Sequence, residues 1–134
     1  MRNRHVIRPT ICLLACAVLA CSDIASPSPS TLDGTWVRLD EVPGSSERWD
    51  LTVDGSSITG TGTWSGEACC SGTLTVNGTI AGETMHVDVT LVTAGTTRPD
   101  VHEHFDGVLA TPDMLVGTGA FENGPAAQVR LRRQ

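Results

Sequence analysis

The sequence predicts an all-β protein: an eight-stranded antiparallel up-and-down barrel, preceded by a signal segment and a disordered tether. Through residues 34–132, apolar residues alternate with polar ones instead of recurring every three or four positions. Turn signals rich in glycine separate the alternating segments at short intervals. The apolar residues of each segment fall on one face, as in a closed sheet with no unpaired edge. A two-sheet β-sandwich is the alternative that this pattern leaves open.

Residues 1–20 have the composition of an export signal. Three arginines precede an apolar stretch at 11–20, which is too short to span a bilayer but suits a signal peptide. The stretch ends in VLAC at 18–21, which resembles the lipobox of bacterial lipoproteins: an aliphatic, a variable and a small residue, then cysteine. The resemblance implies cleavage by signal peptidase II before Cys21 and a diacylglycerol on its thiol. A plain secretory signal, cleaved a few residues later, is the alternative.

Residues 21–31 are expected to form a lipidated cysteine and tether, and residues 32–134 one β-barrel domain. The segment SDIASPSPST at 22–31 favours extended chain and has too few apolar residues to order itself by burial. Membrane lipid would hold the protein through Cys21, stably if two or more acyl chains are attached. Ser22 follows the cysteine, so the resemblance implies the bacterial cell envelope, and the outer membrane or cell surface rather than the inner membrane.

The charge of the exported chain argues against nucleic acid as a partner. Without the three arginines of the signal, six basic residues face fifteen acidic ones, a formal charge of −9. Binding to nucleic acid needs basic residues that displace counterions from phosphates. An acidic surface of this kind keeps an exported protein soluble.

Eight strands are expected between the turn signals. Their ranges are 34–39, 47–53, 57–64, 72–80, 84–92, 100–110, 114–122 and 126–132. Asn77-Gly78 is a competing hairpin signal, but a turn there leaves too few residues before Gly82, so we interpret the pair as a bulge within a strand. Parity directs one apolar set inward: Trp36, Trp49, Leu51, Val53, Ile58, Trp64, Leu74, Val76, Ile80, Met85, Val87, Val89, Leu91, Val101, Phe105, Leu109, Leu115, Phe121, Val129 and Leu131.

The first and last expected strands carry a resemblance to the calycin group, which includes lipocalins, avidins and fatty-acid-binding proteins. GTW at 34–36 is similar to the Gly-x-Trp of lipocalins, whose tryptophan closes the barrel floor beneath an arginine from the last strand. The resemblance implies a floor made of Trp36 with Arg130 or Arg132. GTW at 62–64 is similar to an avidin strand that ends in a ligand-contacting tyrosine, but glycine stands at 66 where avidins carry serine, so biotin is not implied.

A non-catalytic barrel that binds a small apolar ligand is the leading functional hypothesis. Small residues on some expected strands oppose tryptophans on others, which predicts a small cavity on the Gly60/Gly62 side, away from Trp36. The residues expected around it are Trp49, Gly60, Gly62, Trp64, Glu103 and Phe105. Glu103 and Arg38 share inward parity and could orient a ligand as an ion pair, although we favour a strand-end residue that reaches solvent. The alternative function is a surface-displayed interaction module with a filled core.

A weaker alternative is metal or redox handling. His86, His102 and His104 share one outward face, and pairing Leu91 with Val101 would set His86 opposite an aspartate. Imidazoles and carboxylates can bind Zn²⁺ or Cu²⁺. Because that register is assumed and an outer face lacks a dry second shell, we expect weak metal binding or none. No cofactor is expected, and the motifs of common hydrolases and nucleotide-binding enzymes are missing from the sequence.

Cys69 and Cys70 are the remaining thiols after lipidation and removal of the signal. Adjacent Cα atoms lie about 3.8 Å apart, closer than in ordinary disulfides. Export to an oxidising compartment favours a bonded form, and a vicinal disulfide is our first interpretation. A metal-binding or intermolecular role is the second.

The lipobox resemblance generates the first testable prediction. Mass spectrometry of the mature protein should find an N-terminus at Cys21 that carries a diacylglycerol. Substitution of Cys21 by serine should abolish the lipid mass. An unmodified N-terminus at Ala25 or Ser26 would instead identify an ordinary secreted protein.

Overall fold

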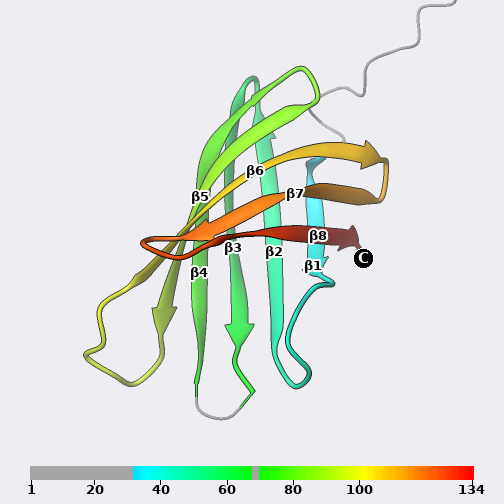
Figure 1. The fold of residues 1–134 in the computed structure, drawn as a ribbon. Helices are drawn as coiled ribbons and strands as arrows, with labels where there is room; N and C mark the ends of the chain where they lie inside the picture. Colours follow the sequence, from blue (N-terminus) through cyan, green and yellow to red (C-terminus); the bar gives the residue numbers. More distant parts are fainter. Residues whose placement is uncertain (1–31, 68–69) are drawn as a thin grey trace, which may run out of the picture.

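The computed structural model describes residues 32–67 and 70–134, which form a closed barrel of eight antiparallel strands in sequence order (Figure 1). The strands are β1 (Gly34–Arg38), β2 (Ser46–Asp54), β3 (Ser57–Ser65), β4 (Ser71–Ala81), β5 (Thr84–Thr93), β6 (Val101–Thr111), β7 (Met114–Phe121) and β8 (Ala126–Arg133). The predicted barrel is confirmed, because β1 also pairs with β8 and no sheet edge remains open. Each predicted strand boundary lies within one residue of the observed one.

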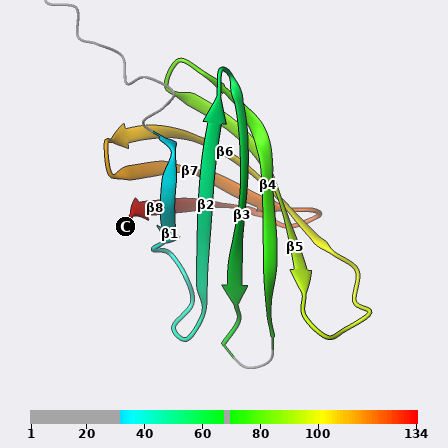
Figure 2. The same ribbon diagram turned by 180° about the vertical axis from the view of Figure 1, so that it is seen from behind.

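The two sides of the barrel cross steeply. β6, β7 and β8 lie in front in Figure 1, whereas β2, β3 and β4 lie in front in Figure 2, where the molecule is seen from behind. β1 is a short strand between β2 and β8. The strong twist that such crossing requires is a property of closed sheets with few strands.

Side chains alternate between the interior and solvent along the middle of most strands, as the parity of the sequence predicts. The buried apolar core holds Leu32, Trp36, Trp49, Leu51, Ile58, Leu74, Val76, Ile80, Met85, Val87, Val89, Leu91, Phe105, Leu109, Leu115, Val129 and Leu131. Val101 and Phe121, also predicted inward, are 44% and 43% exposed because they lie at an open end of the barrel. Val53 and Trp64 are partly buried against the core.

Trp36 closes the opposite end of the barrel. The indole is fully buried and its Nε1 donates a hydrogen bond to the Leu32 carbonyl at 2.9 Å. The Arg133 guanidinium lies 4.5 Å from the ring centroid, a cation–π contact that contributes on the order of 1 kcal/mol. Arg133 Nη1 also donates to the Asp33 carbonyl at 2.5 Å. These contacts tie the chain before β1 to the end of β8.

The arginine on this floor is Arg133, whereas the prediction named Arg130 or Arg132. Arg130 and Arg132 alternate with the inward Val129 and Leu131, so both point outward. Arg130 instead binds Asp40, with Nη2 at 2.6 Å from Oδ1 and Nε at 3.2 Å from Oδ2. Arg133 has the parity of Leu131 and lies at the end of the strand, where its side chain can fold over the indole.

Glycines stand where one strand backbone approaches another closely. A Cβ on Gly62 would lie 1.8 Å from the Arg48 carbonyl oxygen of β2, and one on Gly78 would lie 2.1 Å from the His86 carbonyl oxygen of β5. The predicted bulge at Asn77-Gly78 is wrong, because both residues keep regular pairing with β3 and β5. Within the described residues, the register shift lies between Leu109 and Thr111, where β6 meets β7.

The predicted signal peptide, Cys21, the tether and Cys69 lie outside the described residues. Among residues 32–67 and 70–134, no helix has the length and apolarity needed to cross a membrane.

The close approach at Gly62 generates the second prediction. Gly62→Ala should lower the free energy of unfolding by about 2 kcal/mol or more, because backbone must move to admit a methyl group. Gly66→Ala is the matched control, since the nearest atom to its added Cβ is 3.8 Å away. Urea denaturation should find the control within about 0.5 kcal/mol of the parent. Equal stability of the two variants would contradict the close approach.

Candidate functional site

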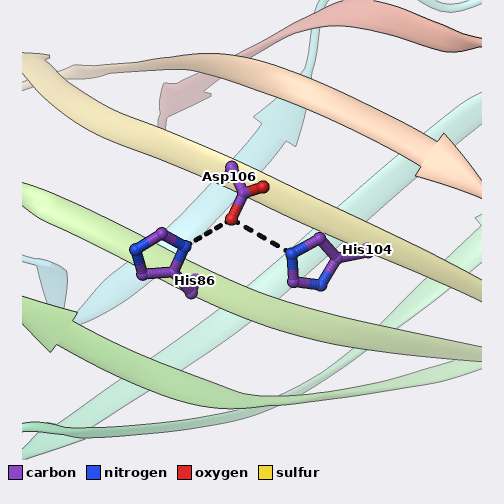
Figure 3. Close-up of side chains that lie close together, drawn as sticks. All are labelled: His86, His104 and Asp106. Carbon is purple, nitrogen blue, oxygen red and sulfur yellow. Dashed lines mark hydrogen bonds and ion pairs between the residues drawn. The ribbon is translucent and has the colours of Figure 1, made fainter.

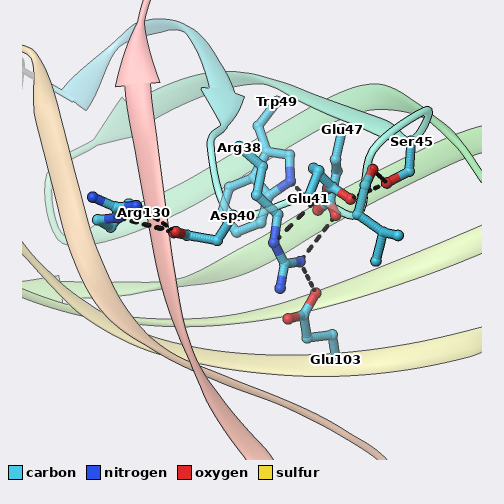
Figure 4. Close-up of polar contacts among 9 residues, drawn as sticks. Arg38, Asp40, Glu41, Ser45, Glu47, Trp49, Glu103 and Arg130 are labelled. Atoms are coloured by element: carbon cyan, nitrogen blue, oxygen red, sulfur yellow. Dashed lines mark hydrogen bonds and ion pairs between the residues drawn. The ribbon is translucent and has the colours of Figure 1, made fainter.

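A buried ionic cluster of Arg38, Glu47 and Glu103 lies beneath the open end of the barrel (Figure 4). Arg38 is the last residue of β1, Glu47 lies near the start of β2, and Glu103 near the start of β6. Arg38 Nη1 donates to Glu47 Oε2 and to Glu103 Oε2, each at 3.0 Å. The inward Arg38–Glu103 pair is therefore present, and the alternative that we favoured from the sequence, a Glu103 that reaches solvent, is wrong: Glu103 is 2% exposed.

The cluster is supported from below by two aromatic side chains. Trp49 Nε1 donates to Glu47 Oε1 at 2.5 Å, so both Glu47 oxygens have partners. The Trp49 and Phe105 rings meet edge to face with centroids 5.7 Å apart. Such pairs contribute roughly 0.5–1.5 kcal/mol beyond burial. The ionic groups thus lie on a packed aromatic layer rather than above a void.

The loop between β1 and β2 adds further charges around the mouth. Arg38 Nε lies 3.8 Å from Glu41 Oε1, and Ser45 Oγ donates to Glu41 Oε2 at 3.0 Å. Asp40 on the same loop is neutralised by the bidentate contact with Arg130, which also lowers the pKa of the Asp40 carboxyl. Apart from Asp40, the carboxylates of Glu41, Glu47 and Glu103 all lie within 4 Å of the Arg38 guanidinium.

The pKa values of Glu47 and Arg38 in the cluster are both raised from their ordinary values. Burial raises the pKa of Glu47 to about 7, although the Arg38 charge and the Trp49 hydrogen bond act in the opposite direction. Burial alone would lower the pKa of Arg38, but Glu47 and Glu103 more than offset this and raise it, so the guanidinium stays charged. Near neutral pH the cluster can therefore gain or lose a proton at Glu47.

A cavity of about 350 Å³ opens above this cluster. Its apolar walls come from Val42, Trp64, Leu91, Val101 and Phe121. Its polar lining comes from Arg38, Asp40, Glu41, Ser45, Ser46, Glu47, Ser65 and the backbone at Gly66. Trp64 is held by a 3.2 Å hydrogen bond from Nε1 to the Val92 carbonyl. The cavity is thus a mostly apolar hollow with one charged patch at its base.

The residues predicted to line the cavity lie in different parts of the barrel. Trp64 lines the cavity, and Glu103 pairs with Arg38 in the ionic cluster that lies beneath it. Trp49 and Phe105 are buried in the layer beneath. At Gly60 and Gly62 the side chains of Leu51 and Leu74 occupy the space over bare backbone. The cavity lies at the open end of the barrel rather than beside these two glycines, because apolar neighbours fill the interior there.

The outward histidines form a second polar group, on β5 and β6 (Figure 3). The register assumed in the sequence analysis is confirmed: Leu91 pairs with Val101, His86 with Asp106, and Asp88 with His104. His86 Nδ1 and His104 Nε2 both contact Asp106 Oδ1, the second at 3.1 Å. The Asp88 hydrogen bond raises the pKa of His104, and the His86 contact lowers the pKa of Asp106.

His102 lies outside this group. Its Nδ1 is 3.2 Å from the Thr90 hydroxyl, and Asp106 takes the place that His102 was expected to fill. Cys70 is disulfide-bonded, while the Cys69 part of the predicted vicinal pair lies outside the described residues.

Glu47 is the site residue that sequence reasoning missed. It shares the parity of Trp49 and Leu51, which were assigned inward, so the pattern contained the signal. The charge of the residue hid it, because acidic side chains are seldom buried without a partner, and the partner lies on another strand.

The barrel is similar to three solved structures, two of which are redesigned β-barrels. One is "mFAP1, bound to DFHBI", with 15% identity and a TM-score of 0.64 over 79% of this chain and all of that one. A second is the redesigned barrel b11L5F_LGL, with 17% identity and a TM-score of 0.64 over 82% of this chain and 99% of that one. A third, EF1p2_mFAP2b bound to DFHBI, has 14% identity, a TM-score of 0.61, and covers 80% of this chain and all of that one. At these identities the likeness shows the fold.

No known protein family matches the sequence, and none of the curated proteins is significantly similar to it.

The buried carboxyl of Glu47 generates the third prediction. Because the pKa of Glu47 is raised from 4.5 to about 7 in the folded protein, the folded state binds this proton more tightly than the unfolded state. The resulting contribution to the free energy of unfolding is complete below pH 4.5 and is lost as the pH rises through 7. The stability of the parent relative to Glu47→Gln should therefore fall by on the order of 2 kcal/mol between pH 4.5 and pH 8. Glu122→Gln, an exposed carboxyl between β7 and β8, is the control and should show no such change. Urea denaturation at both pH values measures the difference, and a parent that gains stability relative to Glu47→Gln would contradict the assignment.

Proposed function

We propose that this protein binds a small, mostly apolar ligand in the open end of its barrel, without catalysis. The observation that carries the proposal is the cavity of about 350 Å³ with apolar walls and a charged base. Ligand sites in proteins typically range from about 300 to 1,000 Å³ and combine apolar walls with a few placed polar groups. The cavity is at the lower end of that range, so the ligand is expected to be compact.

The charged base restricts the polar group of the ligand. Arg38 is already outnumbered by Glu41, Glu47 and Glu103, so an added anion would meet net negative charge. A neutral group that donates hydrogen bonds, or a cation, fits this base better than a carboxylate or phosphate. We therefore expect an uncharged or basic ligand with an apolar body.

The structural neighbours support the architecture for such a role. Two of the three similar structures are bound to DFHBI, so proteins of a similar fold bind a small molecule in those cases. The ligand of this chain is inferred from its own cavity, because the likeness conveys the fold alone.

The filled lower interior favours a second candidate, a displayed interaction module. Trp36, Trp49 and Phe105 occupy the floor and middle of the barrel, and the cavity lies at its open end. In either role we propose an exported lipoprotein anchored to the cell envelope through Cys21. That part rests on the lipobox resemblance in the sequence.

The fourth prediction tests the cavity with a fluorescent apolar amine, N-phenyl-1-naphthylamine. The purified protein should bind it with micromolar affinity, since burial contributes roughly 25 cal/mol per Å² of apolar surface. Val101→Trp should weaken binding at least about tenfold by filling the mouth. Val108→Trp is the matched control on the same strand, 41% exposed against 44% for Val101 and outside the cavity lining, and should bind as the parent does.

Two results would overturn the proposal of binding in this cavity. One is no change in probe fluorescence at any protein concentration that stays soluble. The other is an equal loss in Val101→Trp and Val108→Trp, which would place the probe elsewhere. Either result would leave the displayed module as the better account of the barrel.

A further inference from the structure

A group of three potential metal ligands lies exposed on the outer face of β5 and β6 (Figure 3). His86 comes from β5, and His104 and Asp106 come from β6. The antiparallel register sets His86 directly opposite Asp106, and the two residues of β6 share a face because they are two apart. The pleat of two adjacent strands thus holds the three side chains together.

The ligand atoms are already close to metal-binding geometry. One ligand atom from each of His86, His104 and Asp106 lies within 4.8 Å of the other two. Around a tetrahedral Zn²⁺, with bonds of about 2.0–2.2 Å, neighbouring ligand atoms are separated by roughly 3.3–3.5 Å. The distance from His104 Nε2 to Asp106 Oδ1, 3.1 Å, is near this value. Small rotations of exposed side chains would make room for an ion between them.

A fourth residue supplies the support that metal-binding histidines commonly have. Asp88 Oδ1 lies 2.9 Å from His104 Nδ1, so it accepts the proton on that nitrogen. Nε2, the atom that faces Asp106, donates to that carboxylate in the metal-free protein, and a bound metal ion would replace its proton. A carboxylate on the second ring nitrogen orients a histidine ligand and makes it more basic. The confirmed register removes one objection raised from the sequence, and Asp88 supplies an outer-shell partner, although its side chain is exposed to solvent.

We propose that His86, His104 and Asp106 bind one divalent transition-metal ion, Zn²⁺ or Cu²⁺, with water in the remaining positions. Two imidazoles and one carboxylate suit both ions, and Cu²⁺ binds such sites more tightly than Zn²⁺. Asp106 and Asp88 balance the charge of the ion. Because the three side chains are about half exposed, the affinity is micromolar rather than that of an enclosed structural site.

The fifth prediction tests this site by calorimetric titration of the purified protein, with its cysteines oxidised, against Zn²⁺. One ion should bind with micromolar affinity, and His86→Ala, His104→Ala and Asp106→Asn should each weaken it at least about tenfold. Asp88→Asn should weaken it by a similar factor without removing a ligand. His102→Ala is the matched control, because this exposed histidine on the same face of β6 lies outside the group.

Electron paramagnetic resonance of the Cu²⁺ form gives an independent readout. Nitrogen coupling from two imidazoles is expected in the parent and in His102→Ala, and from one imidazole in His104→Ala. All five substitutions lie on the solvent side, so thermal unfolding without metal should remain close to that of the parent. The proposal fails if neither ion binds at millimolar concentration, or if His102→Ala loses as much affinity as His104→Ala.

Discussion

Pairing of β1 with β8 closes the sheet, and the width of the interior that this closure sets governs the rest of the molecule. Three residue pairs join the two strands, among them Trp36 with Arg133 and Arg38 with Leu131. An interior bounded by eight strands is just wide enough for side chains to fill it or for one small ligand. Here side chains fill the interior at one height, and a cavity remains at another. Trp36, Trp49 and Phe105 fill the floor and middle, and the open end retains a cavity.

The boundary between the filled and open parts is electrostatic. Above the aromatic layer the interior carries Arg38, Glu47 and Glu103, whose charges would be costly to bury without each other. Every described buried polar side-chain atom has a hydrogen-bond partner, so this group is internally satisfied. This group places net negative charge at the base of the cavity, whereas the cavity walls are mostly apolar. Glu47, with its pKa near 7, is the member whose charge follows the pH of the surroundings.

The same alternation of side chains along the strands also gathers polar residues on the outer surface of the barrel. Residues that alternate with the core point to solvent, so a run of polar residues on β5 and β6 becomes one continuous face. Cross-strand pairing then converts three separate positions in the sequence into the His86, His104 and Asp106 group. Asp88 extends this group on the same face. The interior therefore carries the ionic cluster and the outer surface carries the histidine group, because residues of opposite parity point to opposite faces of the sheet.

The sequence by itself determined the strand pattern, because hydrophobic alternation indicates which residues of a strand face solvent. It located the ends of every described strand within one residue. It also determined the outward face that the histidines share, since parity is a local property, but it left open whether Glu103 points inward or reaches solvent. Tertiary structure decided which inward residues meet. The Arg38–Glu47 pair, the choice of Arg133 over Arg130 and the place of the cavity depend on contacts between strands. Those contacts depend on barrel closure and side-chain packing, and alternation along a single strand carries no information about either.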